Sequence, residues 1–206
     1  MTRERGFTLV ELLVAVVILT LFVTASMGAA RIAGRSWEAG YERANATEEM
    51  RAVAQFLRRH IAQMPPLTWS DGSDEHLAFS ASEHNLRFVA PAPRFTRGAG
   101  MLVYTLAIEK VAGTDALTLR YAPFDPGEAS FDEPPAGEQT TLVAGIEAAS
   151  FDYFGAALED EIPAWTNHWR PDAERYPSLI RLRLRREGDD VFWPDLVFAV
   201  RLGDPS

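Results

Sequence analysis

The sequence predicts an α+β protein in which a long N-terminal helix, with a membrane-spanning first half, packs on an antiparallel β-sheet domain. An apolar run near the N-terminus is long enough to cross a bilayer as a helix. An amphipathic pattern with helical spacing follows it and ends at Pro65-Pro66. After these prolines, short alternating runs separated by Gly, Pro and acidic residues are typical of antiparallel strands.

The apolar run extends over 24 residues, from Phe7 to Ala30, and contains one charged residue, Glu11. About 20 apolar residues suffice for a transmembrane helix. A cleaved secretory signal peptide fits less well, because its apolar region has roughly 7–15 residues and only the weak Ala29-Ala30 cue closes this run. A buried core helix is disfavoured because the run is apolar around its whole circumference. Arginines on both sides leave the orientation open.

Glu11 is the unusual residue of this run, because a carboxylate in hydrocarbon costs about 3 kcal/mol unless it is paired. It follows Phe7 by one helical turn. If Phe7 were the first residue of the mature chain, its amine would be a natural cationic partner for Glu11. The alternative, in which the carboxylate extends to the lipid headgroups from near the helix end, stays open on position alone.

The first residues of the run carry a specific motif, since Arg5 to Ala15 read RGFTLVELLVA. This stretch resembles the class III signal of type IV pilins and type II secretion pseudopilins. The resemblance implies that a prepilin peptidase cleaves between Gly6 and Phe7 and methylates the new amine of Phe7. It also implies that Glu11 pairs with the N-terminus of a neighbouring subunit during assembly.

The same resemblance implies a pilin-like fold with four segments. These are a leader peptide at 1–6, a transmembrane helix at 7–30, an amphipathic stalk helix at 31–64 and a periplasmic β-rich domain at 65–206. The expected location is the bacterial inner membrane, crossed once, with the C-terminal domain in the periplasm.

The stalk helix is predicted from an apolar stripe at steps of three and four residues. Its members are Met50, Val53, Leu57, Ile61 and Met64. We expect this stripe to pack in the core of the downstream domain. Trp37 and Tyr41 lie closer to the membrane segment, and we expect them to contact neighbouring subunits.

The β-rich domain has its clearest strand at 178–186, where apolar residues alternate with arginines. A hairpin is expected around Gly113-Thr114-Asp115, and a long loop at 123–138. The other predicted strands are 77–80, 86–89, 101–111, 117–121, 141–144, 151–154 and 196–202, the last of which is expected beside 178–186.

The order of these segments gives a second resemblance. FLRRHIAQM is followed by GMLVYTL, ALTLRY, ASFDYFG, AWTNHW and YPSLIRLRLR. This order resembles the J-type minor pseudopilin of type II secretion, the general secretion pathway protein J family. The implied function is a place in the pseudopilus tip complex, which primes filament assembly and supports export of folded proteins across the outer membrane. The implied partners are the I- and K-type minor pseudopilins, the major pseudopilin and the prepilin peptidase.

Two other functions stay open. One is a minor pilin of a type IV pilus, acting in assembly, adhesion or DNA uptake. Minor pilins share the leader, but their C-terminal domains often carry a cysteine pair, and this chain has no cysteine. The other is a membrane-anchored periplasmic enzyme. We expect no catalytic site and no cofactor, because the histidines are scattered and no catalytic sequence motif occurs.

Composition limits the partners further. A formal net charge of −9 argues against nucleic acid as a partner. The absence of cysteine excludes disulfides and thiolate zinc sites. The acidic groups Asp71, Asp74 and Glu75, and Glu159 to Glu161, lack EF-hand spacing. We expect them to be solvated, with calcium binding as the alternative, and we assign no metal site.

The segment AWTNHWR contains Trp165, Trp169 and Arg170, which are candidate interface residues. Trp and Arg are enriched in interface hot spots. The tryptophans can instead cover the sheet and contribute to the core. The sequence leaves both interpretations open.

Overall fold

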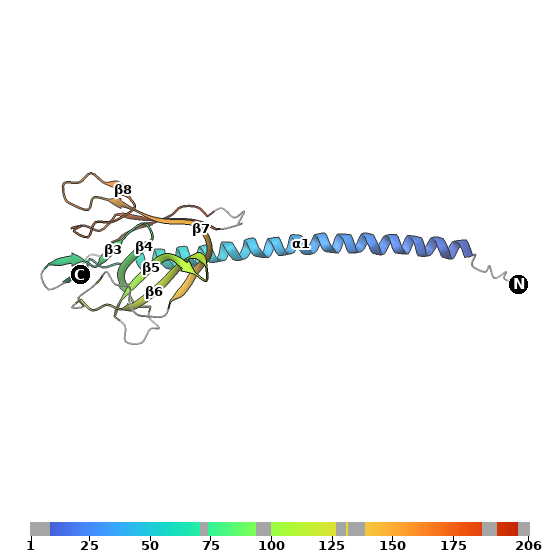
Figure 1. Cartoon of the computed structure of the whole chain (residues 1–206), viewed down its shortest axis with the longest axis horizontal. Coiled ribbons are helices and arrows are strands. Elements are labelled where there is room, and N and C mark those ends of the chain that lie inside the picture. Colours follow the sequence, from blue (N-terminus) through green and yellow to red (C-terminus); the bar gives the residue numbers. More distant parts are fainter. Residues whose placement is uncertain are drawn as a thin grey trace. The chain divides into compact units, whose positions relative to one another are not determined.

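The computed structural model of the chain describes residues 9–70, 74–93, 100–126, 131, 139–186 and 193–201. The predicted leader, together with Phe7, lies outside these residues. Helix α1 comes first and strands follow it (Figure 1). The chain separates into two compact units, Met1–Thr47 and Glu48–Ser206. The elements are α1 (Leu9–Ile61), β1 (Thr68–Ser70), β2 (Glu75–Leu77), β3 (Phe79–Ala81), β4 (Asn85–Pro91), β5 (Met101–Val111), β6 (Thr114–Pro123), β7 (Thr140–Gly155), β8 (Ala164–Thr166), β9 (Leu179–Arg186) and β10 (Leu196–Ala199).

In the first unit, α1 presents large apolar side chains to its surroundings. Leu9 is 82% exposed and Phe22 is 70% exposed. Described hydroxyls of this segment bond within the helix, from Thr20 Oγ1 to the Val16 carbonyl (2.7 Å) and from Ser26 Oγ to the Phe22 carbonyl (2.8 Å). Bonding of this kind keeps a hydroxyl compatible with apolar surroundings.

Within the described residues, no helix meets the combined requirements of length and apolar character for crossing a membrane.

Helix α1 ends at Ile61, three residues before the predicted end at Met64. The last turn tightens, because the Gln63 N–H donates to the His60 carbonyl and the Met64 N–H donates to the Ile61 carbonyl. These are bonds between residues three apart, which are common where an α-helix finishes. Pro65 accounts for the early end, because a proline disfavours helical geometry in the residue before it and has no N–H to donate.

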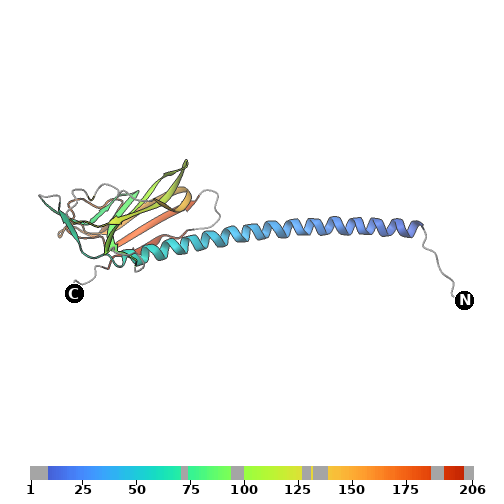
Figure 2. The ribbon, with the colours of Figure 1, turned by 90° about the horizontal axis from the view of Figure 1, so that it is seen from below.

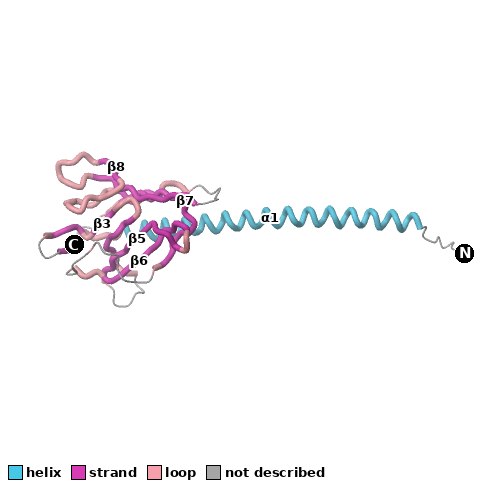
Figure 3. The backbone as a smooth tube through the Cα atoms, in the orientation of Figure 1, coloured by secondary structure: helices cyan, strands magenta, loops and turns pink. Residues whose placement is uncertain are grey.

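In the second unit, strands β3 to β10 form an eight-stranded antiparallel sheet, and β1 and β2 form a separate two-stranded sheet. Figure 3 draws the strands in magenta. The order along the large sheet is β10-β9-β7-β6-β5-β4-β3, and β8 pairs with β7. The predicted antiparallel sheet is therefore confirmed. The strand at 101–111 has the predicted bounds, and β10 lies beside β9 as expected.

Strands β5 and β6 form the expected hairpin, but its turn is Ala112-Gly113 rather than Gly113 to Asp115. Both turn residues have positive φ, 53° and 94°. This is the two-residue turn whose twist matches that of the flanking strands. Thr114 already pairs with Val111 across the hairpin.

The predicted strands 141–144 and 151–154 are one strand, β7. Its first part pairs with β6 up to Ile146, and its second part pairs with β9 from Ile146 to Phe154. Irregular register on both sides of this point, with a φ of +67° at Gly145, lets the strand change partner. The predicted strand 141–144 ended at Ala144, whereas in the structure the chain bends at Gly145 and continues as the same strand.

Three smaller differences concern short strands. The predicted strand 77–80 is divided, because Ala78 lies between β2 and β3 and its N–H donates to the Leu67 carbonyl (2.8 Å). Strand β10 ends at Ala199 rather than at 202. The three-residue strands β1 and β8 were not predicted. Most of the predicted loop 123–138 lies outside the described residues.

The core of the second unit contains the predicted apolar stripe of α1. Leu57 and Ile61 are fully buried, Val53 and Met64 nearly so, and Met50 packs against them partly buried. The prediction of core packing for this stripe is confirmed. A polar contact also joins this part of α1 to the sheet, since Arg186 Nη1 of β9 pairs with Glu49 Oε2 of α1 at 2.7 Å. Figure 2 shows β9 and the C-terminal end of α1 from a second direction.

Candidate functional site

The N-terminal motif lies largely outside the described residues. Gly6 and Phe7 are among the residues that are not described. Glu11, Trp37 and Tyr41 occupy helical positions in α1, but their side chains fall outside the described part of the structure. Cleavage, methylation, subunit pairing and the contacts of Trp37 and Tyr41 therefore stay predictions.

The second candidate site lies in the segment 156–178, which joins β7 to β9 and includes β8. The start of this segment, directly after β7, requires a glycine at position 155. A Cβ atom at this position would lie 3.1 Å from Trp169 Cη2 and 3.3 Å from the Ser178 nitrogen. The φ of +155° also disfavours other residues here. Glycine therefore allows the Trp169 ring to pack directly on the end of β7.

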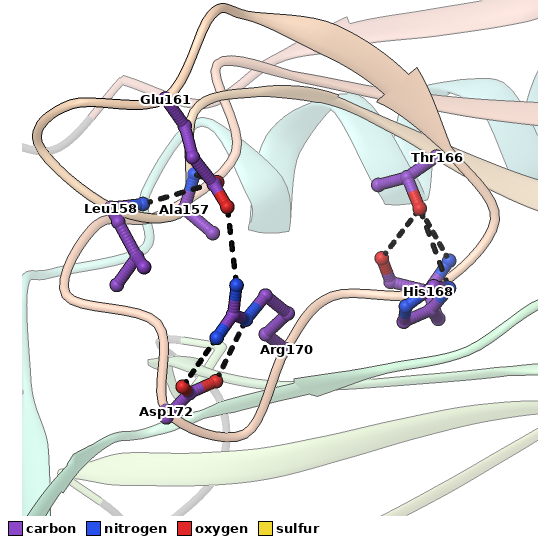
Figure 4. Close-up of polar contacts among 7 residues, drawn as sticks. All are labelled: Ala157, Leu158, Glu161, Thr166, His168, Arg170 and Asp172. Atoms are coloured by element: carbon purple, nitrogen blue, oxygen red, sulfur yellow. Dashed lines mark hydrogen bonds and ion pairs between the residues drawn. The ribbon is translucent and has the colours of Figure 1, made fainter.

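Glu161 holds the first turn of this segment together (Figure 4). Its Oε2 accepts hydrogen bonds from the backbone N–H groups of Ala157 (3.0 Å) and Leu158 (3.3 Å). Its Oε1 pairs with Arg170 Nη1 at 3.2 Å. A carboxylate that accepts backbone N–H bonds orders a loop in the way that a capping residue orders a helix end. Glu161, one of the acidic residues of the candidate calcium group, is thus engaged within the chain.

The Arg170 guanidinium also donates two hydrogen bonds to the Asp172 carboxylate, of 2.9 Å and 2.6 Å (Figure 4). The hydrogen bond with Asp172 raises the pKa of Arg170, and the same bond lowers the pKa of Asp172. Both side chains are exposed, so water screens this pair. The guanidinium of Arg170 therefore serves the loop itself, and a role at an interface would have to use its remaining N–H groups.

Trp169 belongs to the core. It is 5% exposed, and its indole Nε1–H donates to the Arg175 carbonyl at 2.9 Å. Its backbone N–H donates to the Ala81 carbonyl at 2.8 Å, so this residue also covers the free edge of β3. Of the two interpretations that the sequence left open, the structure favours core cover for Trp169.

Trp165 lies at the surface. It is 40% exposed, and its ring packs on Phe154 with centroids 5.4 Å apart. The Arg181 guanidinium lies 4.2 Å from the ring centroid, a cation–π arrangement. Asp152 fixes that guanidinium through a 3.2 Å bond to Arg181 Nε. An aromatic side chain held in a fixed orientation and partly exposed is what an interface anchor requires, so an interface role for Trp165 stays a prediction.

A hollow of about 340 Å³ lies in this segment, between Gly155, Trp169 and the 88% exposed Ile162. His168 lines it, with Nδ1 3.2 Å from Asn167 Oδ1. No group of three or more His, Asp or Glu residues in the described part of the chain is placed to hold a metal ion. Asp71 lies outside that part, and Glu159 pairs with Arg175 at 3.1 Å.

Sequence reasoning did not connect Asp152 with the arginines of β9. Arg181 and Arg183 both bond to this nearly buried carboxylate, at 3.2 Å and 2.9 Å. The alternation of the arginines placed them on one face of a strand, but their partner lies 29 and 31 residues away. Only the pairing of β7 with β9 brings these groups together.

Comparison with known proteins gives two findings. Residues 1–27 match the family described as the prokaryotic N-terminal methylation motif. Over 205 residues, the chain is 27% identical to the type II secretion system protein J of Xanthomonas campestris pv. campestris, an alignment that covers 96% of this chain and 93% of that protein. Both resemblances drawn from the sequence, in the leader and in the whole chain, are therefore confirmed.

Proposed function

We propose that the chain is a J-type minor pseudopilin of a type II secretion system. The observation that carries the proposal is the similarity to type II secretion system protein J, because it extends over nearly the whole of both chains. The methylation motif alone would not suffice, since it covers only residues 1–27 and pilins share this leader type. The relative's name denotes a secretion-system component, and no catalytic role is proposed for this chain.

The proposed maturation begins at the leader. A prepilin peptidase removes residues 1–6 and methylates the amine of Phe7. The apolar run from Phe7 to Ala30 then holds the chain in the inner membrane, with the β domain in the periplasm. This step rests on the sequence of the run, which has one charge in 24 residues, and on the exposure of apolar side chains such as Leu9 and Phe22.

Assembly uses the two ends of α1 differently. Near the N-terminus, Glu11 pairs with the amine of a neighbouring subunit and sets the axial register. Near the other end, Leu57 and Ile61 are buried in the core of the second unit. Burying such side chains contributes about 2 kcal/mol each. A force applied along this part of the helix is therefore transmitted to the core of the domain. Such a connection suits a subunit that transmits filament movement.

The proposed partners are the I- and K-type minor pseudopilins and the major pseudopilin. Together they form the tip complex that primes the pseudopilus, which then supports export of folded proteins through the outer membrane. We include the partly exposed Trp165, which contacts Arg181 and Phe154, among the residues that contribute to such an interface.

A deletion strain tests the proposal. Loss of exoenzyme secretion, restored by the intact gene and with surface pili unaffected, is the expected result. Loss of piliation or twitching with normal secretion would instead identify a minor pilin of a type IV pilus. The matched control is a strain complemented with a chain that lacks residues 7–30, which is expected to remain defective because the β domain is no longer anchored.

A further inference from the structure

A hollow of about 380 Å³, lined by residues of β7 and β9, has no part in the proposed function. This volume is at the small end of the range for ligand sites. We call it the Trp193 hollow. Its polar lining consists of Glu83, Ser150, Arg183, Arg185, Trp193 and Asp195.

Trp193 supplies an unused donor. The side chain is 6% exposed, and its buried indole Nε1–H has no acceptor among the described residues. A buried indole N–H normally has a hydrogen-bond partner, because leaving it without one forfeits the bonds it made with water. A hydrogen-bond acceptor that enters the hollow would give the Trp193 N–H the partner it lacks among the described residues.

The hollow offers further donors beside it. Arg183 is half exposed and pairs with Asp152 through Nη2, and a guanidinium has five N–H groups. Arg185 pairs with Glu147 at 2.9 Å and is also exposed. Both guanidinium groups are thus ion-paired at the surface and retain N–H groups for another acceptor.

Two carboxylates give the lining its acceptors. Asp195 is 55% exposed and lies 3.9 Å from Arg181 Nη1, and Glu83 accepts a bond from Asn167 Nδ2 at 3.4 Å. With Arg183 and Arg185 they leave the lining formally neutral. A lining with balanced charges gives neither an anion nor a cation a net electrostatic advantage. The best match is an uncharged group that both donates and accepts, and the peptide unit is such a group.

We propose that the Trp193 hollow binds an uncharged peptide segment of another filament subunit through its main-chain amides, with the Trp193 N–H donating to a carbonyl. The choice of a filament subunit as occupant rests on the proposed function. The amide chemistry rests only on the lining.

The test uses the full-length chain in cells that make the whole system. A photoreactive benzoylphenylalanine replaces Ser150 in the hollow, or the exposed Lys110 near the β5–β6 hairpin as a control. The expected result is a cross-link from position 150 to an uncharged stretch of another pilin-like subunit, and none to that stretch from position 110. A cross-link only to an exported protein, or no cross-link from position 150, would overturn the proposal.

Two variants then test the chemistry. Trp193→Phe removes the N–H and keeps a ring, and we expect about a fivefold loss of the cross-link, as for one lost hydrogen bond. Arg183→Gln is expected to act similarly. Arg175→Gln is the control, because Arg175 is equally exposed (52% against 50%) and also pairs with a carboxylate. Thermal unfolding checks that each variant is folded. If Trp193→Phe is not folded, the result for Arg183→Gln decides. An unchanged cross-link in a variant that is folded refutes the site.

These outcomes separate the inference from the proposed function. A deletion strain with normal secretion would refute the secretion role, while a cross-link to a pilin-like subunit would still support the hollow. Conversely, a secretion defect without a cross-link from position 150 would leave the secretion role standing and refute the hollow.

Discussion

Truncation of the two tryptophans of the β7–β9 segment distinguishes core cover from interface. Trp169 is 5% exposed and Trp165 is 40% exposed. A tryptophan buries roughly 200 Å², and at about 25 cal/mol per Å² this gives about 4–5 kcal/mol for Trp169→Ala. Trp165→Ala is expected to lose about 3 kcal/mol, because 40% of this residue stays in water and only the remainder contributes buried area.

The measurement is thermal and denaturant unfolding of the full-length chain in detergent. For a chain of this size, 1 kcal/mol corresponds to about 2–4 °C in Tm. We therefore expect Trp169→Ala to lower Tm by about 8–20 °C and Trp165→Ala by about 6–12 °C. Trp169→Phe is the intermediate control, since it keeps an aromatic ring and removes the bond to the Arg175 carbonyl.

Binding to partner subunits should depend more on Trp165 than on Trp169, the reverse of the order expected for stability. Trp165→Ala should weaken co-purification with the other tip subunits more than its loss of stability explains, whereas Trp169→Ala should not. Equal destabilisation by the two alanine variants, or a loss below about 1 kcal/mol for Trp169→Ala, would refute the reasoning from burial.

Three further predictions concern the leader and one buried histidine. Replacing Gly6 with leucine should leave the precursor six residues longer by mass spectrometry, and normal processing would remove the leader assignment. Glu11→Leu should be inserted and cleaved but fail to enter filaments, which pull-down of assembled pseudopili measures; wild-type assembly would exclude the pairing role. Burial lowers the pKa of His60 from its ordinary value of 6.5, so its neutral form stabilises the fold fully above about pH 6.5, and this contribution falls as the pH drops through and below that value. His60→Gln should reduce the decline in unfolding free energy between pH 7.5 and pH 5 relative to the native chain, and identical pH profiles would contradict this account.

The elements that sequence reasoning placed well are those with a local cause. The burial of Leu57 and Ile61 follows from their helical spacing, and the bounds of β5 follow from an alternating run between turn residues. The helix end was displaced by three residues, because the proline that ends it also distorts the turn before it. The strand β7 was predicted as two separate strands, because a glycine that bends a strand, here Gly145, looks in sequence like one that ends it.

The sequence by itself determined the leader motif, the apolar run with Glu11, the buried stripe of α1 and the antiparallel class of the domain, because each depends on residues within one or two turns or strands of each other. The tertiary structure alone decided that Trp169 faces inward while Trp165 lies at the surface, that Asp152 bonds Arg181 and Arg183, and that Trp193 shares a hollow with Arg183. These features depend on which strands pair. Pairing brings together residues far apart in the chain, as when the Tyr153 hydroxyl donates to the Ser82 carbonyl 71 positions away, and a local pattern carries no record of such a partner.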